Sequence, residues 1–184
     1  MKNSSLNRRD STANKAVWFF LFFFCWAPLF ACQSRTTNIK DDLQKYLEHA
    51  KQWTAAEEQI NNAVAVVRRD EFVHDDLITA TLKPIIAVSR EHVHVLEQYH
   101  PQTPPLVNVH QEYIEAWRSL SLAITAIVDA AAKKDYIQLA KAKNDLLEAQ
   151  QSVSGALSDL ARLLRETGLW KKSVKKSLSP AENH

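Results

Sequence analysis

The stretch LVNVHQEYIEAWRSLSLAITAIVDAAA, residues 106–132, predicts a long amphipathic helix. Its apolar and aromatic side chains recur every three or four residues, which is the spacing of one face of an α-helix. Thr103 and Pro104 come just before it, in the order of a helix N-cap and a first-turn proline. We therefore expect a helix from about Pro105 to Ala132 whose core-facing residues are Leu106, His110, Tyr113, Trp117, Leu120, Ile124, Ile127 and Ala131.

Three other segments show the same period, at about residues 39–68, 71–99 and 135–167. Asp70 is the expected N-cap of the second of them, and Gly168 is the expected stop of the last. The expected core positions are, in chain order, Leu43, Tyr46, Ala50, Trp53, Glu57, Ile60, Val64 and Val67; Leu77, Ile78, Ile85, Val88, Val95 and Leu96; and Leu139, Lys143, Leu146, Gln150, Val153, Leu157, Leu160 and Leu164.

The order of these segments predicts the fold class. The connections between them are short, so that sequential helices are expected to be antiparallel neighbours. Pro84 lies inside the second helix and predicts a kink there. The sequence therefore predicts an all-α protein, an up-down-up-down antiparallel four-helix bundle. Helix-hairpin repeats are the alternative, and they are less favoured because no two similar copies are found.

Composition and charge limit the class of protein. The chain has 184 residues, of which 46% are hydrophobic and 24% charged, and its formal net charge is +2. Acidic residues slightly outnumber basic ones in residues 33–164, whereas basic residues are in excess in residues 165–184. A nucleic-acid-binding domain concentrates positive charge on its folded part. The charge distribution therefore argues against nucleic acid as a partner.

The N-terminal part has the order of an export signal. Residues 1–15 are polar and basic, and residues 16–32 are apolar without a charge. The apolar run is at the short limit for crossing a bilayer, so that an uncleaved anchor or a released protein are the alternatives to a lipid-anchored one. Cys25 lies inside the apolar run and is expected to leave with the signal.

The end of the apolar run, Leu29-Phe30-Ala31-Cys32, resembles the lipobox of bacterial lipoproteins. The resemblance implies cleavage between Ala31 and Cys32 and lipidation of Cys32 by a diacylglycerol and an N-linked acyl chain such as palmitate. These three acyl chains exceed the two signals that stable membrane attachment requires. Gln33, rather than aspartate, follows the cysteine, which in Gram-negative lipoproteins implies sorting to the outer membrane, facing the periplasm. The expected organisation is a signal peptide at 1–31, a lipidated cysteine and tether at 32–38, the bundle at 39–168 and a tail at 169–184.

Two polar residues interrupt the apolar stripes near the middle of the predicted bundle. If the first and fourth helices pair antiparallel, Glu57 faces Gln150, and Thr81 lies at a similar level. The spacing thus allows a polar layer of these three residues. The favoured interpretation is that Glu57 leans to the edge of the bundle, reaches solvent and fixes the register of the helices, because buried charges are rarely kept unless they are paired.

The sequence contains no motif that commits it to a reaction. It has no nucleophile-elbow motif, glycine-rich phosphate loop or haem-attachment motif. Glu71-Phe-Val-His74 and Glu97-Gln-Tyr-His100 have the spacing of di-iron bundle proteins, but both lie on one predicted helix, far apart. We therefore expect neither an enzyme nor a metal or cofactor. The histidines near the proline-containing loop, His92, His100 and His110, are interpreted as solvated side chains. A loose surface copper or zinc site formed by them is the alternative.

The C-terminal segment is basic and amphipathic. Trp170, Val174 and Leu178 recur every four residues, and the lysines among them are Lys171, Lys172, Lys175 and Lys176. This pattern suits an anionic lipid surface or an acidic partner. The alternative is a frayed, solvated chain end.

Together these features predict a lipid-anchored envelope protein whose bundle binds or scaffolds another envelope protein. Secretion-system pilotins and envelope-stress lipoproteins are analogues in size and composition only. A metal- or small-ligand-binding bundle is the alternative function. The expected partners are the membrane, through the lipid on Cys32, and an envelope protein.

Overall fold

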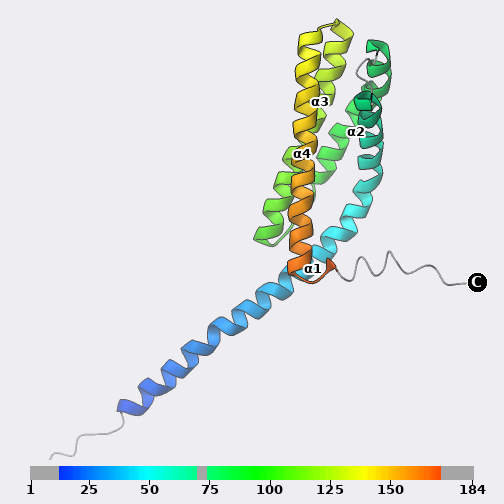
Figure 1. The fold of residues 1–184 in the computed structure, drawn as a ribbon. Helices are drawn as coiled ribbons and strands as arrows, with labels where there is room; N and C mark the ends of the chain where they lie inside the picture. The colour runs from blue at the N-terminus through cyan, green and yellow to red at the C-terminus, as the bar shows by residue number, and fades with distance from the viewer. Residues whose placement is uncertain (1–12, 70–73, 171–184) are drawn as a thin grey trace, which may run out of the picture. The chain divides into compact units, whose positions relative to one another are not determined.

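The computed structural model describes the backbone of residues 13–69 and 74–170, and the side chains of residues 38–68 and 74–170. This part of the chain contains four helices and no strand. The helices are α1 (Ala13–Arg69), α2 (Asp75–Glu97), α3 (Pro104–Lys133) and α4 (Tyr136–Glu166) (Figure 1). The chain forms two compact units, Met1–Asn38 and Ile39–His184. The expected N-cap Asp70 lies outside the described residues.

Helix α1 begins at Ala13, well before the expected start near residue 39. Residues 33–38, expected as a tether, have helical backbone. They include neither glycine nor proline, so that nothing in the local sequence ends the helix.

Between Ile39 and Glu166 the described residues form an all-α, up-down-up-down four-helix bundle, as predicted. Helices α1 and α3 run in the same direction, because Asp42 contacts Thr103 near their starts within the bundle, and Glu57 contacts Tyr113 further along. Figure 1 shows α3 and α4 running side by side. Long-range hydrogen bonds also join α2 to α3 and α1 to α4.

Three helix ends follow ordinary capping chemistry, and two of them, at Thr103 and Gly168, are predicted by the sequence. Thr103 is the N-cap of α3, with proline in the first turn. The side chain of Asp135 caps α4 by accepting a hydrogen bond from the backbone N–H of Gln138 at 3.1 Å. Gly168, the predicted stop, follows α4 with φ +74°, a left-handed conformation that glycine adopts without a side-chain clash.

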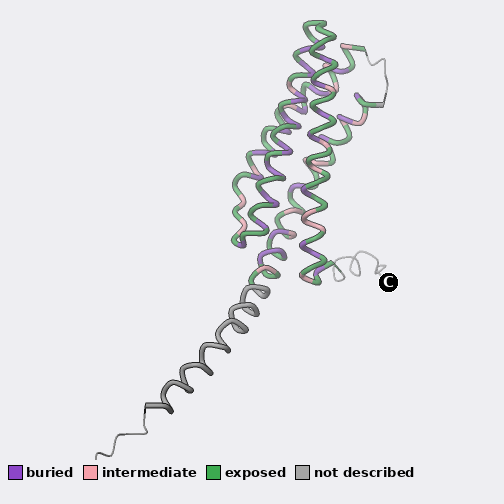
Figure 2. Tube along the Cα trace, turned by 60° about the vertical axis from the view of Figure 1, so that its left-hand side comes forward, coloured by how far each residue is buried: buried purple, intermediate pink, exposed green. Residues whose placement is uncertain are grey.

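The predicted core positions of α3 are all buried, and those of α1 are buried or half-buried. Figure 2 shows buried and exposed residues alternating along the helices of the bundle. Two expectations are wrong. Leu77 of α2 and Leu157 of α4 are each 47% exposed. In α4 the second buried column consists of Ala142, Ala149 and Ala156 and not of Lys143, Gln150 and Leu157, each one position later in the sequence. Small alanine side chains let α4 lie close against its neighbours, which favours this face over the larger residues beside it.

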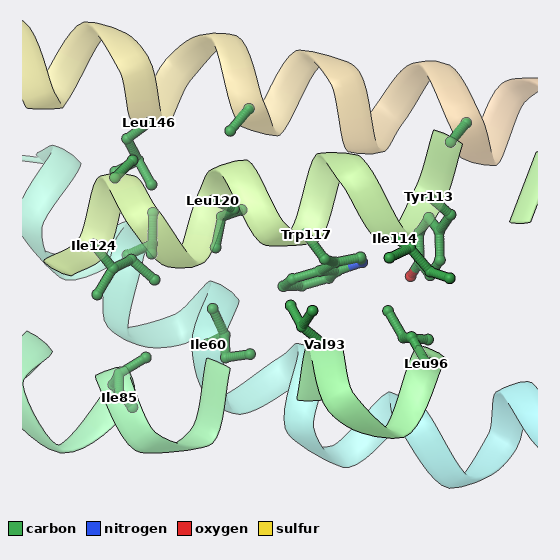
Figure 3. Close-up of a cluster of buried hydrophobic side chains, with 14 of the residues drawn as sticks. Ile60, Ile85, Val93, Leu96, Tyr113, Ile114, Trp117, Leu120, Ile124 and Leu146 are labelled. Atoms are coloured by element: carbon green, nitrogen blue, oxygen red, sulfur yellow. The ribbon is translucent and has the colours of Figure 1, made fainter. Parts of the chain in front are cut away.

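The bundle has two chemically different ends. The aliphatic end comprises residues 60–68, 75–88 and 122–149, and every buried side chain described there is apolar. Figure 3 shows Ile60, Ile85 and Ile124 from three helices converging at its border. Each fully buried side chain of this kind contributes about 1.5–3 kcal/mol.

The polar end comprises residues 42–57, 89–121 and 153–169. It holds all six buried polar residues of the described part of the chain, which are Asp42, Ser89, His92, Thr103, His110 and Ser121. The pair Ser89 and Ser121 lies at the border with the aliphatic end, with the two hydroxyl oxygens 2.9 Å apart.

Candidate functional site

The first component of the polar end is a carboxylate that ties α1 to the start of α3. Asp42 is only 7% exposed. Its Oδ2 accepts hydrogen bonds from the backbone N–H groups of Gln102 and Thr103, at 3.0 and 2.8 Å, and from the Thr103 hydroxyl at 2.7 Å. A negative charge at a helix N-terminus is stabilised by the helix dipole. Because Thr103 gives its hydroxyl to Asp42, it caps α3 through its backbone and not through its side chain.

The second component is a histidine with a defined tautomer. His110 Nε2 lies 3.0 Å from the backbone oxygen of Leu96, and Nδ1 lies 3.2 Å from the hydroxyl of Tyr46. A carbonyl oxygen only accepts, so Nε2 carries the proton and Nδ1 accepts from Tyr46. Burial lowers the pKa of His110 and raises that of Tyr46, which keeps both groups neutral. His110 therefore occupies the core position that the helical stripe of α3 predicts, and it is not one of the solvated histidines expected near the proline-containing loop.

Aromatic rings surround this histidine. Trp53 stacks on His110, with ring centroids 5.9 Å apart and an interplanar angle of 22°. Tyr46 and Tyr99 each meet the His110 ring edge to face, at 5.4 and 5.6 Å. Such pairs are each worth about 0.5–1.5 kcal/mol beyond simple burial. The rings therefore fix the relative positions of α1, α2 and α3 at this end.

The third component is centred on Glu57 of α1. The Tyr113 hydroxyl donates a hydrogen bond to Glu57 Oε1 at 2.7 Å, and His92 Nε2 lies 3.7 Å from the same oxygen. The second distance is too long for a hydrogen bond. Burial raises the pKa of Glu57, while the Tyr113 bond works in the opposite direction. Burial lowers the pKa of His92 to about 4, so that its imidazole is neutral near pH 7.

His92 is buried, with 3% of its surface exposed, and is likewise not the solvated side chain expected from the sequence. Its Nε2 has no hydrogen-bond partner among the described residues, and the same holds for Trp117 Nε1. The two rings pack edge to face, with centroids 4.5 Å apart. In Figure 3, Trp117 extends from α3 to lie beside Val93 of α2.

Two cavities flank α1 at this end of the bundle. One, of about 390 Å³, lies between α1 and α2, and its lining includes Trp53 and His92. The other, of about 210 Å³, lies between α1, α3 and α4. The residues lining the second cavity include Tyr46, Lys51, Trp53, Glu57, Tyr113 and Leu160.

The predicted polar-layer residues occupy different places. Glu57 is half-buried against Tyr113 and His92. Gln150 instead accepts a hydrogen bond from Arg68 at 3.3 Å. Thr81 precedes His92 by eleven residues, which is about 16 Å along α2. The three share no hydrogen bond within the described part of the chain.

Sequence reasoning did not identify the groups that Glu57 meets. His92 and Tyr113 come from two other helices, and their meeting depends on how those helices are aligned along the bundle. The sequence contains one indication that His110 and Tyr113 belong to a site, because each is a residue with a polar group at a predicted core position.

The remaining predicted site residues lie mostly outside the described side chains. Ala31 and Cys32 belong to the part of α1 for which only the backbone is described, and the four tail lysines lie beyond residue 170. Leu169 is buried, and Trp170 is exposed. Within the residues that the structure describes, no helix is long and apolar enough to span a membrane. The same residues contain no group of three or more histidine, cysteine, aspartate or glutamate side chains that could hold a metal ion.

Comparison with known proteins identifies no similar protein. No family model matches the chain, and neither the curated proteins nor the solved structures give a match. Function must therefore be argued from the chain itself.

Proposed function

We propose that this protein is a bacterial envelope lipoprotein whose helical bundle binds or scaffolds another envelope protein. The observation that carries the proposal is the sequence Leu29-Phe30-Ala31-Cys32, followed by a compact helical unit that begins at Ile39. Lipidation of Cys32 would place this unit next to a membrane. Gln33 favours the outer membrane, with the bundle facing the periplasm.

The lipid anchor is tested by replacing Cys32 with alanine. Cys32→Ala is expected to abolish the acylated mature form and to leave the unprocessed precursor, detected by labelling with a radioactive fatty acid and by the mass of the protein. Cys25→Ala is the matched control, because it removes a cysteine from the same apolar run and leaves the lipobox intact. Unchanged processing and membrane attachment of Cys32→Ala would favour the uncleaved anchor instead.

Exposed apolar side chains at the aliphatic end support a role in protein binding. The Tyr136 hydroxyl donates to Asp75 Oδ2 at 3.2 Å, which joins the start of α4 to the start of α2. The segments that meet there carry the exposed side chains of Leu77, Tyr136 and Ile137, of which Ile137 is 82% exposed. Apolar side chains gathered on a surface are typical of protein contacts.

Site-specific cross-linking tests the partner. A photo-reactive residue at position 137, introduced into the full chain in cells, is expected to capture one reproducible envelope protein, identified by mass spectrometry. Gln151, an exposed polar position on the same helix, is the control and is expected to give no such product. Equal products at both positions, or none at position 137, would argue against this surface as a binding site.

The basic tail is proposed to add a contact with anionic lipid. Removal of residues 171–184 keeps buried Leu169 in place and deletes the four lysines. The truncated protein is expected to bind phosphatidylglycerol vesicles more weakly than the full chain, with the difference shrinking as salt is added. Equal binding by both proteins would leave the tail as a solvated chain end.

A second candidate function is binding of a small ligand within the bundle. It is favoured by one observation, the cavity next to Glu57 between α1, α3 and α4.

A further inference from the structure

The cavity between α1, α3 and α4 combines aromatic rings with one carboxylate. Tyr46, Trp53 and Tyr113 contribute the rings, and Glu57 contributes the carboxylate. Leu160 and its neighbours on α4 close the opposite side with apolar surface. Aromatic rings attract cations through the negative potential of their faces, and a nearby carboxylate adds to that attraction.

Glu57 has no cationic partner among the described residues. The groups that face its Oε1 are the Tyr113 hydroxyl from α3 and the His92 imidazole from α2. Both are neutral near pH 7, since burial raises the pKa of Tyr113 and lowers that of His92 to about 4. A half-buried carboxylate without an opposite charge destabilises the folded protein. A bound cation would supply that opposite charge and remove part of the destabilisation.

Lys51 also lines this cavity, but it is an exposed residue. Its ammonium group forms no ion pair with Glu57 within the described part of the chain. An exposed lysine is screened by water and salt and moves freely. It therefore leaves the charge at the inner wall of the cavity uncompensated.

The size of the cavity restricts the ligand. Its volume of about 210 Å³ is below the usual range of about 300–1,000 Å³ for sites that hold drug-sized molecules. The hydroxyl groups in its lining, those of Tyr46, Thr54 and Tyr113, already form hydrogen bonds within the protein. A ligand rich in hydroxyl groups would therefore lose more hydration than it recovers. A compact cation with alkyl groups fits both conditions.

We propose that this cavity binds a small organic cation of the alkylammonium class. Glu57 is its counter-ion, and the rings of Tyr46, Trp53 and Tyr113 surround its alkyl groups. This binding activity is additional to the proposed scaffold function and does not depend on it, since the cavity lies at the polar end and the proposed protein-binding surface at the aliphatic end.

The experiment compares choline with dimethylbutanol, its uncharged carbon isostere, on the full chain in a non-ionic detergent. Binding is followed by calorimetry and by tryptophan fluorescence, to which Trp53 in the cavity contributes. Choline is expected to bind saturably and at least about tenfold more tightly than dimethylbutanol, because only the cation gains from the carboxylate and the rings. Equal affinity of the two probes, or no saturable choline binding, would overturn the proposal.

Variants then locate the site. Glu57→Gln keeps the shape of the side chain and removes its charge, and it is expected to weaken choline binding by about tenfold or more. Glu58→Gln is the matched control, because it makes the same change at the exposed neighbouring residue. Equal losses in both variants would show a non-specific charge effect and would overturn the assignment.

Two further measurements guard the interpretation. Tyr113→Phe keeps the ring and removes the hydroxyl that bonds Glu57, so that it is expected to retain choline binding. Tyr113→Leu removes the ring and is expected to weaken binding. Circular dichroism checks that each variant is folded.

Vesicles of phosphatidylcholine and phosphatidylglycerol distinguish the source of the cation. Competition of free choline by phosphatidylcholine vesicles alone would assign the ammonium group to a lipid headgroup.

Discussion

The aliphatic end and the polar end are built on the same helices but hold together in different ways. At the aliphatic end, branched side chains and alanines pack without a buried polar atom in need of a partner. At the polar end, Asp42, His92 and His110 are buried, and aromatic rings pack against the two histidines. Asp42 is hydrogen-bonded to the start of α3, and both ring nitrogens of His110 have partners on other helices. Packing of the first kind tolerates small adjustments, whereas the second depends on defined geometry.

The two ends also differ in their cavities. Both cavities beside α1 adjoin the polar end, where Trp53 lines each of them. Rings held by specific contacts cannot shift freely to fill a gap, and the hydrogen bonds that hold them add further constraints. Binding of small molecules is therefore expected at the polar end, and most of the pH-independent stability at the aliphatic end.

The largest expected effect is a truncation at the aliphatic end. Ile124→Ala removes a fully buried side chain and is expected to lower the free energy of unfolding by about 2–5 kcal/mol. The loss should be the same at pH 7 and pH 5, because no described buried titratable group lies at this end. Denaturant unfolding measures both values. Leu122→Ala, at a residue 66% exposed on the same helix, is the control and should change stability by less than about 0.5 kcal/mol. A strongly pH-dependent loss in Ile124→Ala would break the distinction between the two ends.

The next effect is a pH dependence that belongs to the polar end. The pKa of His92 is lowered from 6.5 to about 4 in the folded protein. Between pH 6.5 and about pH 4, His92 is protonated in the unfolded chain but neutral in the folded protein. The free energy of unfolding therefore falls as the pH is lowered through this range. Between pH 7 and pH 5 this group should cost about 2 kcal/mol. Glu57 acts in the opposite direction, because its raised pKa lets the folded protein bind a proton first.

Comparison of the unaltered protein with His92→Gln isolates the histidine contribution. Urea unfolding at several pH values should show a smaller loss on acidification in the variant. His94→Gln, at an exposed position of the same helix, should keep the pH profile of the unaltered protein. Identical profiles for all three proteins would mean that His92 is protonated in the folded state at pH 5.

The periodic part of this structure was readable from sequence, since a buried stripe is a local property of one helix. All eight predicted positions of α3 are buried, because that stripe is marked by large apolar and aromatic residues. The second column of α4 was missed because alanine gives a weak hydrophobic signal, and the larger residues Gln150 and Leu157 stand beside it in the sequence.

The contacts between helices were not readable in the same way. Asp42 meets Thr103 across 61 positions of sequence, and Glu57 meets Tyr113 across 56. Which residues meet depends on the axial alignment of the helices, and a shift of one turn replaces every partner. The prediction of a layer through Glu57 assumed one such alignment of α1 with α4, and the packing selected other partners.

A smaller effect is expected for the carboxylate at the start of α3. Asp42→Asn keeps the size of the side chain but removes the charge that accepts three hydrogen bonds near the N-terminus of α3. Stability should fall by about 1–2 kcal/mol, measured by denaturant unfolding. Asp41→Asn, at the exposed neighbouring position, should have little effect. Equal effects of the two substitutions would mean that Asp42 contributes only general charge.

The smallest effect is expected at the border between the two ends, and its asymmetry is informative. The Ser89 hydroxyl donates to the backbone oxygen of Ile86 at 3.1 Å, so the Ser121 hydroxyl must be the donor in the contact between the two serines. Ser121→Ala removes that donor and leaves the hydrogen of Ser89 satisfied, for a cost of about 0.5 kcal/mol. Ser89→Ala instead leaves the buried Ser121 hydroxyl without this acceptor and should cost about 1 kcal/mol. The double variant should cost less than the sum of the two, because no unpaired group remains. Equal single effects, or an additive double variant, would mean that the serines contribute as isolated side chains, and the border would then belong to the aliphatic end.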